Sequence, residues 1–328
     1  MADLVTAGEA AQMIAAGQLL LIAGASKQLD QLPQGQWIGG STPYFMAAEG
    51  GVVDEERVFV TRLDYPVTSA AVRVYTKDDL QSIPRDYAQN GYSFVILPAG
   101  SEAHLRFDRE CALWPGLFNS PLIGWNAGVH VSQVLSRLPR VFDGTTRQSF
   151  DSAAVVMHTA LAPGHIARVE IINAFRQGKG DKLTFRRSGF VVDDCDVNGS
   201  PQNFADYIKA NHIDIRWPLV ADYAGERINV SFQAIDHTSK QVRMYAPLFE
   251  GIEYRLADPP QDLAQIFGRE FDARQVKPAF SCNCVLNFLY AELEGKRTGA
   301  ATGPITFGEI AYIQLNQTLV YVTFEASA

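Results

Sequence analysis

Two cysteines, Cys282 and Cys284, stand one residue apart near the start of the stretch "FSCNCVLNFLYAELEG" (280–295). In a strand, residues i and i+2 point to the same face, so both thiols would project into one site. Paired cysteines of zinc sites are usually separated by about two to four residues, and a nucleophilic thiol needs a base or a positive field nearby. The spacing therefore favours two small buried residues at a strand end, with a reactive thiol at Cys282 as the alternative.

Polar residues follow short glycine turns at two places. Ser41 and Thr42 come directly after two consecutive glycines, and hydroxyls with free N–H groups in a concave turn suit a carboxylate or phosphate oxygen. Glu309 follows a glycine at the start of an apolar strand. Its carboxylate either accepts backbone N–H groups across the turn or binds a ligand amine. A plain structural turn is the alternative reading at both places.

Arg62 lies on the alternating segment "ERVFVTRL" (56–63). A guanidinium on an otherwise apolar strand can pair with an anionic ligand group through two parallel hydrogen bonds. Three histidines, His104, His130 and His158, are candidates for an axial haem ligand. A core histidine with its nitrogens hydrogen-bonded is the commoner case. We therefore expect no cofactor and no metal, and haem is kept as the alternative.

The familiar signatures of catalysis are absent from the sequence. It contains no GxxxxGK[ST] phosphate loop, no GxSxG elbow and no HExxH helix. This disfavours an enzyme with a familiar signature. An enzyme that acts through Cys282 or Glu309 remains an alternative function.

The composition is that of an ordinary globular protein. Of 328 residues, 47% are hydrophobic and 20% are charged, and the net charge of −8 gives no electrostatic reason to expect nucleic acid or an anionic membrane as a partner. Four cysteines are too few for a disulfide framework, which fits a reducing compartment. The N-terminus lacks a basic n-region, and the apolar run 19–25 is shorter than the roughly 20 residues that cross a bilayer. We expect a cytoplasmic protein.

Local signals predict an alternation of helices and strands. Thr6 and Glu9 form a capping box that should begin a helix at about residue 7, and Gly17 should end it. Residues 113–150 read as an irregular connector, rich in Pro, Gly and Trp. Strand patterns dominate from 150 to 257, and Ser200 and Pro201 should open a helix there. Residues 19–63 and 278–325 show the same order of strand, short helix, strand with a glycine turn, and strand.

The sequence resembles the FIST domain, a bacterial sensory domain, in several motifs. These are "GEI" (308–310), "NQT" (316–318), "FSC" (280–282), "IGGST" (38–42) and the central stretch "VVDDCDVNGSPQNFADY" (191–207). The sequence departs from the family where Asn283, Cys284 and Val285 replace an arginine that often follows "FSC", and where "PYF" (43–45) replaces a "GEI" in the first half. The resemblance implies small-ligand binding as a sensor input, and some members of the family bind haem to sense nitric oxide.

These observations lead to one expected architecture and function. We expect an α/β (α+β mixed) fold of two similar lobes, with boundaries at 1–112, 113–150 and 151–328. The expected function is that of a non-catalytic sensory or accessory protein that binds a small molecule in a cleft between the two lobes, with a signalling protein or a second copy of the chain as partner. The hypothetical ligand-binding residues are Ser41, Thr42, Arg62, Cys282, Glu309 and Asn316.

Overall fold

The first helix begins where the sequence predicts it. In the computed structural model, which describes residues 2–223 and 225–327, α1 (Ala7–Ala15) has the full capping box between Thr6 and Glu9. Gly17 follows the helix with a φ of 73°, a left-handed conformation that glycine adopts without steric cost. The apolar face of α1 buries Ala10 and Ile14.

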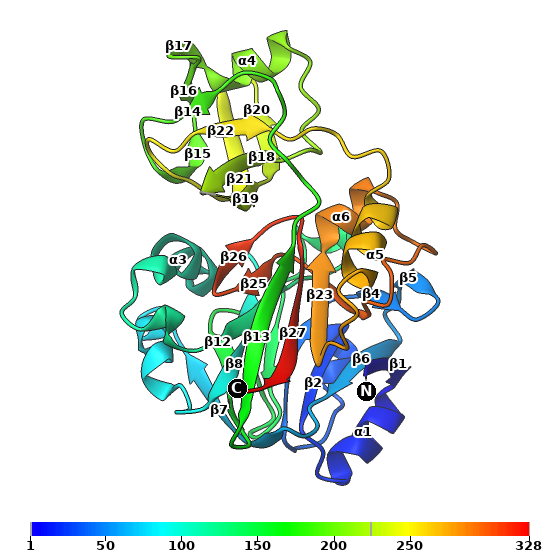
Figure 1. The fold of residues 1–328 in the computed structure, drawn as a ribbon. Helices are drawn as coiled ribbons and strands as arrows, with labels where there is room; N and C mark the ends of the chain where they lie inside the picture. Colours follow the sequence, from blue (N-terminus) through cyan, green and yellow to red (C-terminus); the bar gives the residue numbers. More distant parts are fainter. Residues whose placement is uncertain (1, 224, 328) are drawn as a thin grey trace. The chain divides into compact units, whose positions relative to one another are not determined.

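The predicted α/β class is confirmed (Figure 1). Strands hold 43% of the chain in five mixed or antiparallel sheets, and helices hold 19%. The chain divides into two compact units: unit 1 comprises residues 1–172, 264–314 and 319–328, and unit 2 comprises residues 173–263 and 315–318. Among the described residues, no helix is long and apolar enough to span a bilayer.

Unit 1 contains three topological repeats. Repeat I consists of β1 (Ala2–Thr6), α1, β2 (Leu20–Gly24), α2 (Ser26–Leu29), β3 (Trp37–Ser41), β4 (Tyr44–Ala47), β5 (Gly50–Val53) and β6 (Arg57–Arg62). Repeat II consists of β7 (Val67–Tyr75), η1 (Leu80–Asp86), β8 (Gly91–Pro98), α3 (Glu102–Glu110), η2 (Cys111–Leu113), η3 (Leu117–Asn119), β9 (Leu122–Ala127), η4 (Val131–Gln133), β10 (Val141–Asp143), β11 (Gln148–Phe150) and β12 (Ala154–Leu161).

Repeat III is interrupted by unit 2. It consists of β13 (His165–Ile172), then, after the insertion, α5 (Leu263–Asp272), β23 (Phe280–Cys284), α6 (Val285–Tyr290), β24 (Gly303–Thr306), β25 (Glu309–Ala311), β26 (Ile313–Leu315) and β27 (Leu319–Ala326). The order shared by 19–63 and 278–325 thus belongs to repeats I and III. The second copy, in 67–161, escaped the sequence reasoning, because α3, η2 and η3 lengthen its crossover.

The three repeats build three sheets of the same design. Their strand orders are β1-β6-β2-β3-β10-β11, β7-β12-β8-β9-β25-β26 and β13-β27-β23-β24-β4-β5. Each sheet has one parallel pair joined through a helical crossover, namely β2–β3, β8–β9 and β23–β24. Each sheet also contains two strands from another repeat. Strands β10 and β11 of repeat II join the sheet of repeat I, β4 and β5 of repeat I join the sheet of repeat III, and β25 and β26 of repeat III join the sheet of repeat II.

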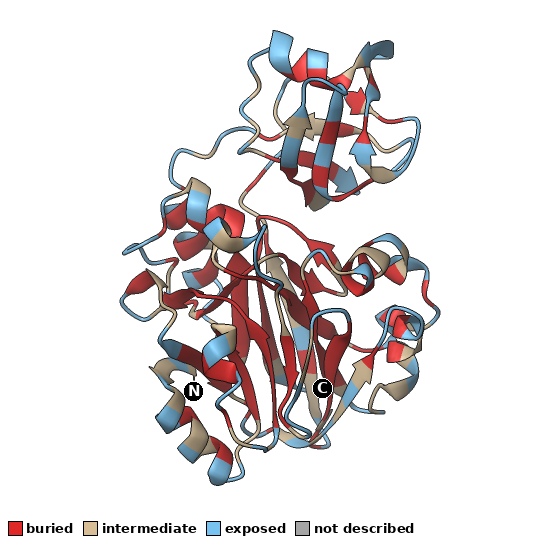
Figure 2. Ribbon diagram, turned by 180° about the vertical axis from the view of Figure 1, so that it is seen from behind, coloured by how far each residue is buried: buried red, intermediate tan, exposed pale blue. Residues whose placement is uncertain are grey.

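Aromatic residues and small glycines form the core where the repeats meet. Trp125 of β9 stacks on Phe280 of β23 with ring centroids 5.3 Å apart, and Phe94 of β8 meets the same Phe280 ring edge-on at 5.2 Å. A Cβ on Gly40 would lie 2.7 Å from both the Ile96 side chain and the Trp125 indole nitrogen. This close approach accounts for glycine in "IGGST". Figure 2 shows the strands of unit 1 as mostly buried.

Unit 2 is an inserted β-rich unit with one helix. Its elements are β14 (Leu183–Thr184), β15 (Gly189–Val192), β16 (Asp194–Val197), β17 (Ser200–Asn203), α4 (Phe204–Ala210), β18 (Leu219–Tyr223), β19 (Glu226–Val230), β20 (Phe232–Asp236), β21 (Gln241–Leu248) and β22 (Tyr254–Leu256). They form a six-stranded sheet, β17-β16-β14-β22-β18-β19, and a three-stranded sheet, β15-β21-β20. The aromatic rings of Phe185, Phe204, Phe232 and Tyr254 lie in its core.

Two sequence-based expectations differ from this fold. The segment 113–150 is not a connector, because its strands β9 and β10 pair inside two sheets of unit 1. The expected boundaries at 112/113 and 150/151 therefore do not coincide with the two units. The helix expected at Ser200–Pro201 begins later: 200–203 form β17, and the Asn203 side chain caps α4 instead.

Candidate functional site

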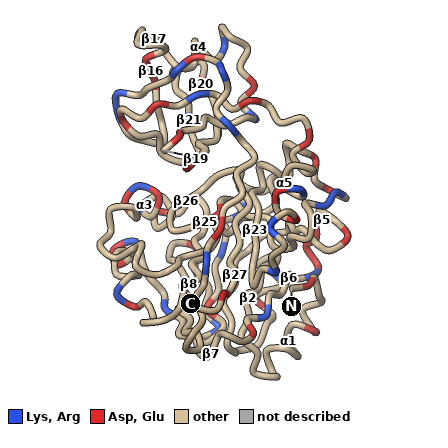
Figure 3. Tube along the Cα trace, in the orientation of Figure 1, with Lys and Arg blue, Asp and Glu red and all other residues tan. Residues whose placement is uncertain are grey.

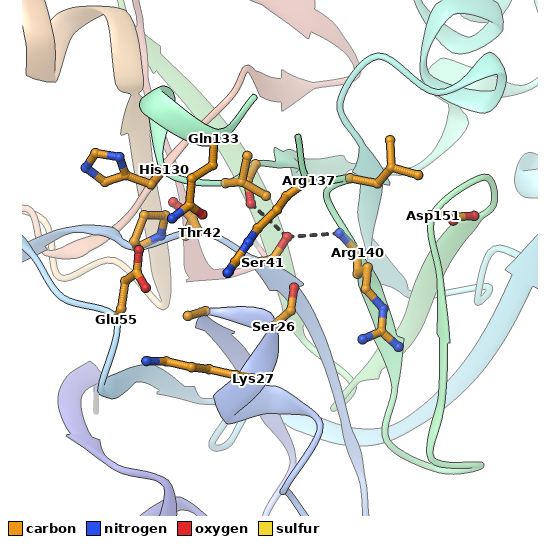
Figure 4. Close-up of a pocket in the computed structure, with 15 residues that line it drawn as sticks. Ser26, Lys27, Ser41, Thr42, Glu55, His130, Gln133, Arg137, Arg140 and Asp151 are labelled. Atoms are coloured by element: carbon orange, nitrogen blue, oxygen red, sulfur yellow. Dashed lines mark hydrogen bonds between the residues drawn. The ribbon is translucent and has the colours of Figure 1, made fainter. Parts of the chain in front are cut away.

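A pocket of about 340 Å³ opens at the carboxyl ends of the parallel strands β2 and β3 (Figure 4). This volume lies in the range of small-molecule sites, and in open α/β sheets ligands typically bind beyond the carboxyl ends of parallel strands. We call it the Ser41 pocket. It is lined by Ala25, Ser26, Lys27, Ser41, Thr42, Pro43, Glu55, Gly128, Val129, His130, Gln133, Arg137, Leu138, Arg140 and Asp151.

Ser41 and Thr42 line this pocket, but their hydroxyls already hold the fold together. Ser41 Oγ donates to the Gly128 carbonyl (2.8 Å) and accepts from the Arg140 N–H (2.9 Å). Thr42 Oγ1 donates to the Ile305 carbonyl (2.7 Å). Both residues are almost fully buried. They therefore fix the floor of the pocket and the segment that covers it, while other groups remain to meet a ligand.

Three cations border the pocket, and two of them have carboxylate partners. Lys27 Nζ lies 2.6 Å from Glu56, and this hydrogen bond is the main cause of the raised pKa of Lys27. Arg140 pairs with Asp30 at 2.7 Å. Within the described part of the chain, the guanidinium of Arg137 has no ion-pair partner. Figure 4 shows the Arg137 side chain extending into the pocket toward Ser41.

Two carboxylates on the pocket wall, those of Glu55 and Asp151, are also without a bonding partner among the described residues. Neither Glu55 nor Asp151 has an ion pair or a side-chain hydrogen bond among the residues described. Glu55 lies near the base of the pocket, close enough to contribute to the raised pKa of Tyr44, whose main cause is burial. In Figure 4, Asp151 stands on the side of Arg137 away from Glu55.

The apolar part of the lining comes mainly from the segment between β9 and β10. Val129 is buried, whereas Leu138 is 68% exposed. Two further apolar residues of this segment, Val134 and Leu135, are 50% and 100% exposed. Exposed aliphatic side chains beside charged groups suit a ligand that has both an apolar and a charged part.

Cys282 and Glu309 do not line the Ser41 pocket. Both are almost fully buried, and the Cys282 Sγ contacts the Gly124 carbonyl at 3.8 Å. Cys282 borders a space of only about 10 Å³, too small for a metabolite. Burial raises the pKa of the Cys282 thiol well above its ordinary value, and the nearby Glu309 raises it further. A thiolate nucleophile at Cys282 is therefore not supported, and neither Cys282 nor Glu309 shares a pocket with Ser41 and Thr42.

The other two proposed ligand-binding residues are also elsewhere. Arg62 pairs with Asp64 at 2.7 Å and does not line the Ser41 pocket. Asn316 belongs to unit 2. There its Oδ1 accepts from the Ser231 N–H (3.4 Å), and its Nδ2 donates to the Leu315 carbonyl (2.9 Å).

The histidines considered as haem ligands are engaged by protein groups. Both ring nitrogens of His158 are hydrogen-bonded, to Tyr75 Oη (2.9 Å) and to Ser93 Oγ (2.8 Å). His104 Nδ1 accepts from a backbone N–H, and its Nε2 lies 3.2 Å from the buried Asp108. His130 lines the Ser41 pocket and contacts Ser132 through Nδ1. In the described residues, no group of three or more His, Cys, Asp or Glu is arranged to hold a metal ion.

Comparison with known proteins places the sequence in a family. It belongs to DUF6976, a family of unknown function. The match covers residues 5–325, so the DUF6976 region includes the three repeats and the inserted unit 2. A search of curated proteins found no match. Nothing in these comparisons links the chain to the FIST domain.

Sequence reasoning missed the charged residues that the pocket leaves uncommitted. In this DUF6976 protein, Arg137 lies on the loop between η4 and β10, and Glu55 lies in the short turn between β5 and β6. One signal was present: "VSQVLSRLPR" (131–140) combines basic residues with apolar residues at 131, 134, 135 and 138, which is the spacing of a helix face. The structure forms only η4 (Val131–Gln133) there, and the rest of the segment is a loop, the kind of element that often carries binding residues.

Proposed function

We propose that the protein binds a small molecule with an anionic group in the Ser41 pocket. The observation that carries this proposal is the uncommitted guanidinium of Arg137, which extends into a pocket of metabolite size. Guanidinium groups bind carboxylates and phosphates through two parallel hydrogen bonds. Since Lys27 and Arg140 are already paired, Arg137 is the cation available to a ligand.

The proposed role is binding without catalysis, as in a sensory or accessory protein. Neither hydroxyl at the base of the pocket is paired with a general base: Ser41 and Thr42 donate to backbone carbonyls. A sensory role of the FIST kind, a signalling protein as partner, a homo-oligomer and a cytoplasmic location stay predictions from the sequence. The same holds for the expectation that neither nucleic acid nor a membrane is a partner. Figure 3 shows positive and negative residues interspersed along the chain, which fits that expectation.

Native mass spectrometry of freshly purified protein tests the proposal. The expected spectrum contains a bound small molecule, which is lost from Arg137→Ala and retained by Arg85→Ala. Arg85 is an exposed arginine outside the pocket and serves as the matched control. A panel of small carboxylic acids, organic phosphates and amino acids is then tested for thermal stabilisation. If no compound stabilises the protein, or if Arg137→Ala binds as well as wild type, the proposal is wrong.

A further inference from the structure

The side chains that line the Ser41 pocket carry charges of both signs, so the pocket is not suited to a ligand that carries negative charge alone. After the pairs Lys27–Glu56 and Arg140–Asp30 are formed, one cation and two carboxylates remain on the wall. A ligand that carried only negative charge would meet repulsion from Glu55 and Asp151. A ligand that carried only positive charge would meet Arg137. Like charges across an interface cost affinity, so the ligand should offer both signs.

We propose that the ligand of the Ser41 pocket is a zwitterion of the amino-acid class, whose carboxylate binds Arg137 and whose ammonium group binds Glu55. This inference rests on the proposed function and names the ligand class for the same site. The zwitterion supplies one charge-assisted contact to Arg137 and one to Glu55. Its third substituent then meets the aliphatic side chains of Val129 and Leu138.

Arg137 and Glu55 are close enough to act on one small molecule. Both groups act on the pKa of Lys27. The hydrogen bond to Glu56 is the main cause of its rise, the charge of Glu55 raises it further, and the charge of Arg137 lowers it. Glu55 and Arg137 are therefore both near the ammonium group of Lys27. Figure 4 shows the Glu55 carboxylate and the Arg137 guanidinium entering the pocket from opposite walls. The space between them is part of the 340 Å³ pocket.

Glu55, rather than Asp151, is assigned to the ammonium group. Glu55 shares the electrostatic neighbourhood of Lys27 and Arg137 and also affects the Tyr44 hydroxyl. In Figure 4, Asp151 lies beyond Arg137, on the side of Arg140. Asp151 therefore provides a matched control, because its replacement also removes one carboxylate from the wall of the same pocket.

The test uses three compounds that share one apolar part. They are L-leucine, 4-methylpentanoate, which lacks the amine, and 3-methylbutylamine, which lacks the carboxylate. The other protein-forming L-amino acids are screened in parallel, since the third substituent is not fixed by the charges. Affinity of the full-length protein is measured by calorimetry. At least one amino acid should bind about tenfold or more tightly than its analogue without the amine, and also than its analogue without the carboxylate.

Variants assign the two contacts. Glu55→Gln should weaken amino-acid binding about tenfold or more, while the amine-free acid should bind at least as well as to wild type, because a repelling carboxylate is gone. Asp151→Asn should retain amino-acid affinity. Equal binding of amino acid and amine-free acid, or an unchanged affinity in Glu55→Gln, overturns the zwitterion inference and leaves the proposed function intact. If neither amino acids nor other small acids and phosphates bind, both proposals fail.

Discussion

The hydroxyl of Ser41 donates a hydrogen bond to the carbonyl of Gly128, which lies 87 positions later in the chain. The same oxygen accepts the backbone N–H of Arg140. One buried side chain of repeat I thus holds both ends of the segment 128–140, which covers the pocket. The sequence suggested the Ser41 hydroxyl as a group that binds a ligand. In the structure, this hydroxyl holds the loop that carries Arg137 in place.

Ser41→Ala should lower the free energy of unfolding by about 1–3 kcal/mol, because a buried carbonyl and a partly buried N–H lose their partner together. Chemical denaturation measures the change. Ser69→Ala is the control, since Ser69 is exposed on β7. An unchanged denaturation midpoint in Ser41→Ala would contradict the proposed fastening role.

Gly128→Ala should destabilise the protein by about 1–3 kcal/mol, the usual cost of overpacking a core. A Cβ at this position would lie 1.8 Å from the ring of Phe307, so the ring would have to move away. Gly180→Ala is the control, because a Cβ at Gly180 would meet no atom within 4 Å. Equal melting temperatures for the two variants would show that the Phe307 contact is not maintained.

The stability of the protein should fall as the pH is lowered through the range in which free histidine becomes protonated. Burial lowers the pKa of His158 to about 4, and the adjacent Arg73 lowers it as well, while Asp86 opposes the shift. The unfolded chain, with a histidine pKa of about 6.5, then binds a proton that the folded protein does not. Stability is therefore full above pH 6.5 and declines by about 3 kcal/mol as the pH falls to 4.

NMR titration of the His158 ring and denaturation at several pH values measure this effect. A titration midpoint near the ordinary histidine pKa would contradict the prediction. His212→Gln provides the control, because His212 is exposed; it should leave the pH dependence of stability close to that of wild type.

Cys282 should resist alkylation at neutral pH. The thiol is buried, and its raised pKa keeps it protonated, whereas the thiolate is the form that reacts. Iodoacetamide labelling followed by mass spectrometry should find Cys282 unmodified in native protein and modified in denaturant. Selective and rapid labelling of native Cys282 would instead favour the alternative of a catalytic thiol.

The purified protein should show no Soret absorption band. Binding of haem iron by His158 would break its hydrogen bond to Tyr75 or to Ser93, each of them buried. The loss of a buried hydrogen bond of this kind costs about 1–3 kcal/mol. A strong Soret band would restore the haem alternative and direct attention to His130, which is partly exposed and lines the Ser41 pocket.

The parts of the fold that the sequence revealed are those set by local chemistry. Thr6 and Glu9 specify the start of α1 through neighbouring backbone groups, and Asn198 and Gly199 adopt the positive φ expected of an "NG" turn. The sequence also singled out Ser41 and Thr42 as candidate ligand-binding residues, and both line the Ser41 pocket. The sequence could not reveal that a side chain at Gly40 would clash with Trp125, because these two residues are brought together only by the packing of two repeats.

The rest of the site depends on pairings between distant segments. Whether a cation is free or paired is decided by partners such as Asp30 for Arg140 and Glu56 for Lys27, which are far along the chain. Arg137 and Arg140 look alike in the sequence, and only the fold distinguishes them. Likewise, Glu309 is buried where β25 pairs with β9 of another repeat, and the Cys282 thiol contacts the Gly124 carbonyl of the same β9.

The position of β27 has a consequence for biosynthesis. This strand, 319–326, lies between β13 and β23 and pairs with both. As the chain emerges from the ribosome, β13 appears long before β27, the strand that lies between β13 and β23 in the sheet. The segment 173–263, which holds all the strands of unit 2, can assemble in the meantime, and residues 315–318 join it later. The inserted unit is thus expected to acquire its structure during translation, ahead of the third sheet of the unit that surrounds it in the sequence.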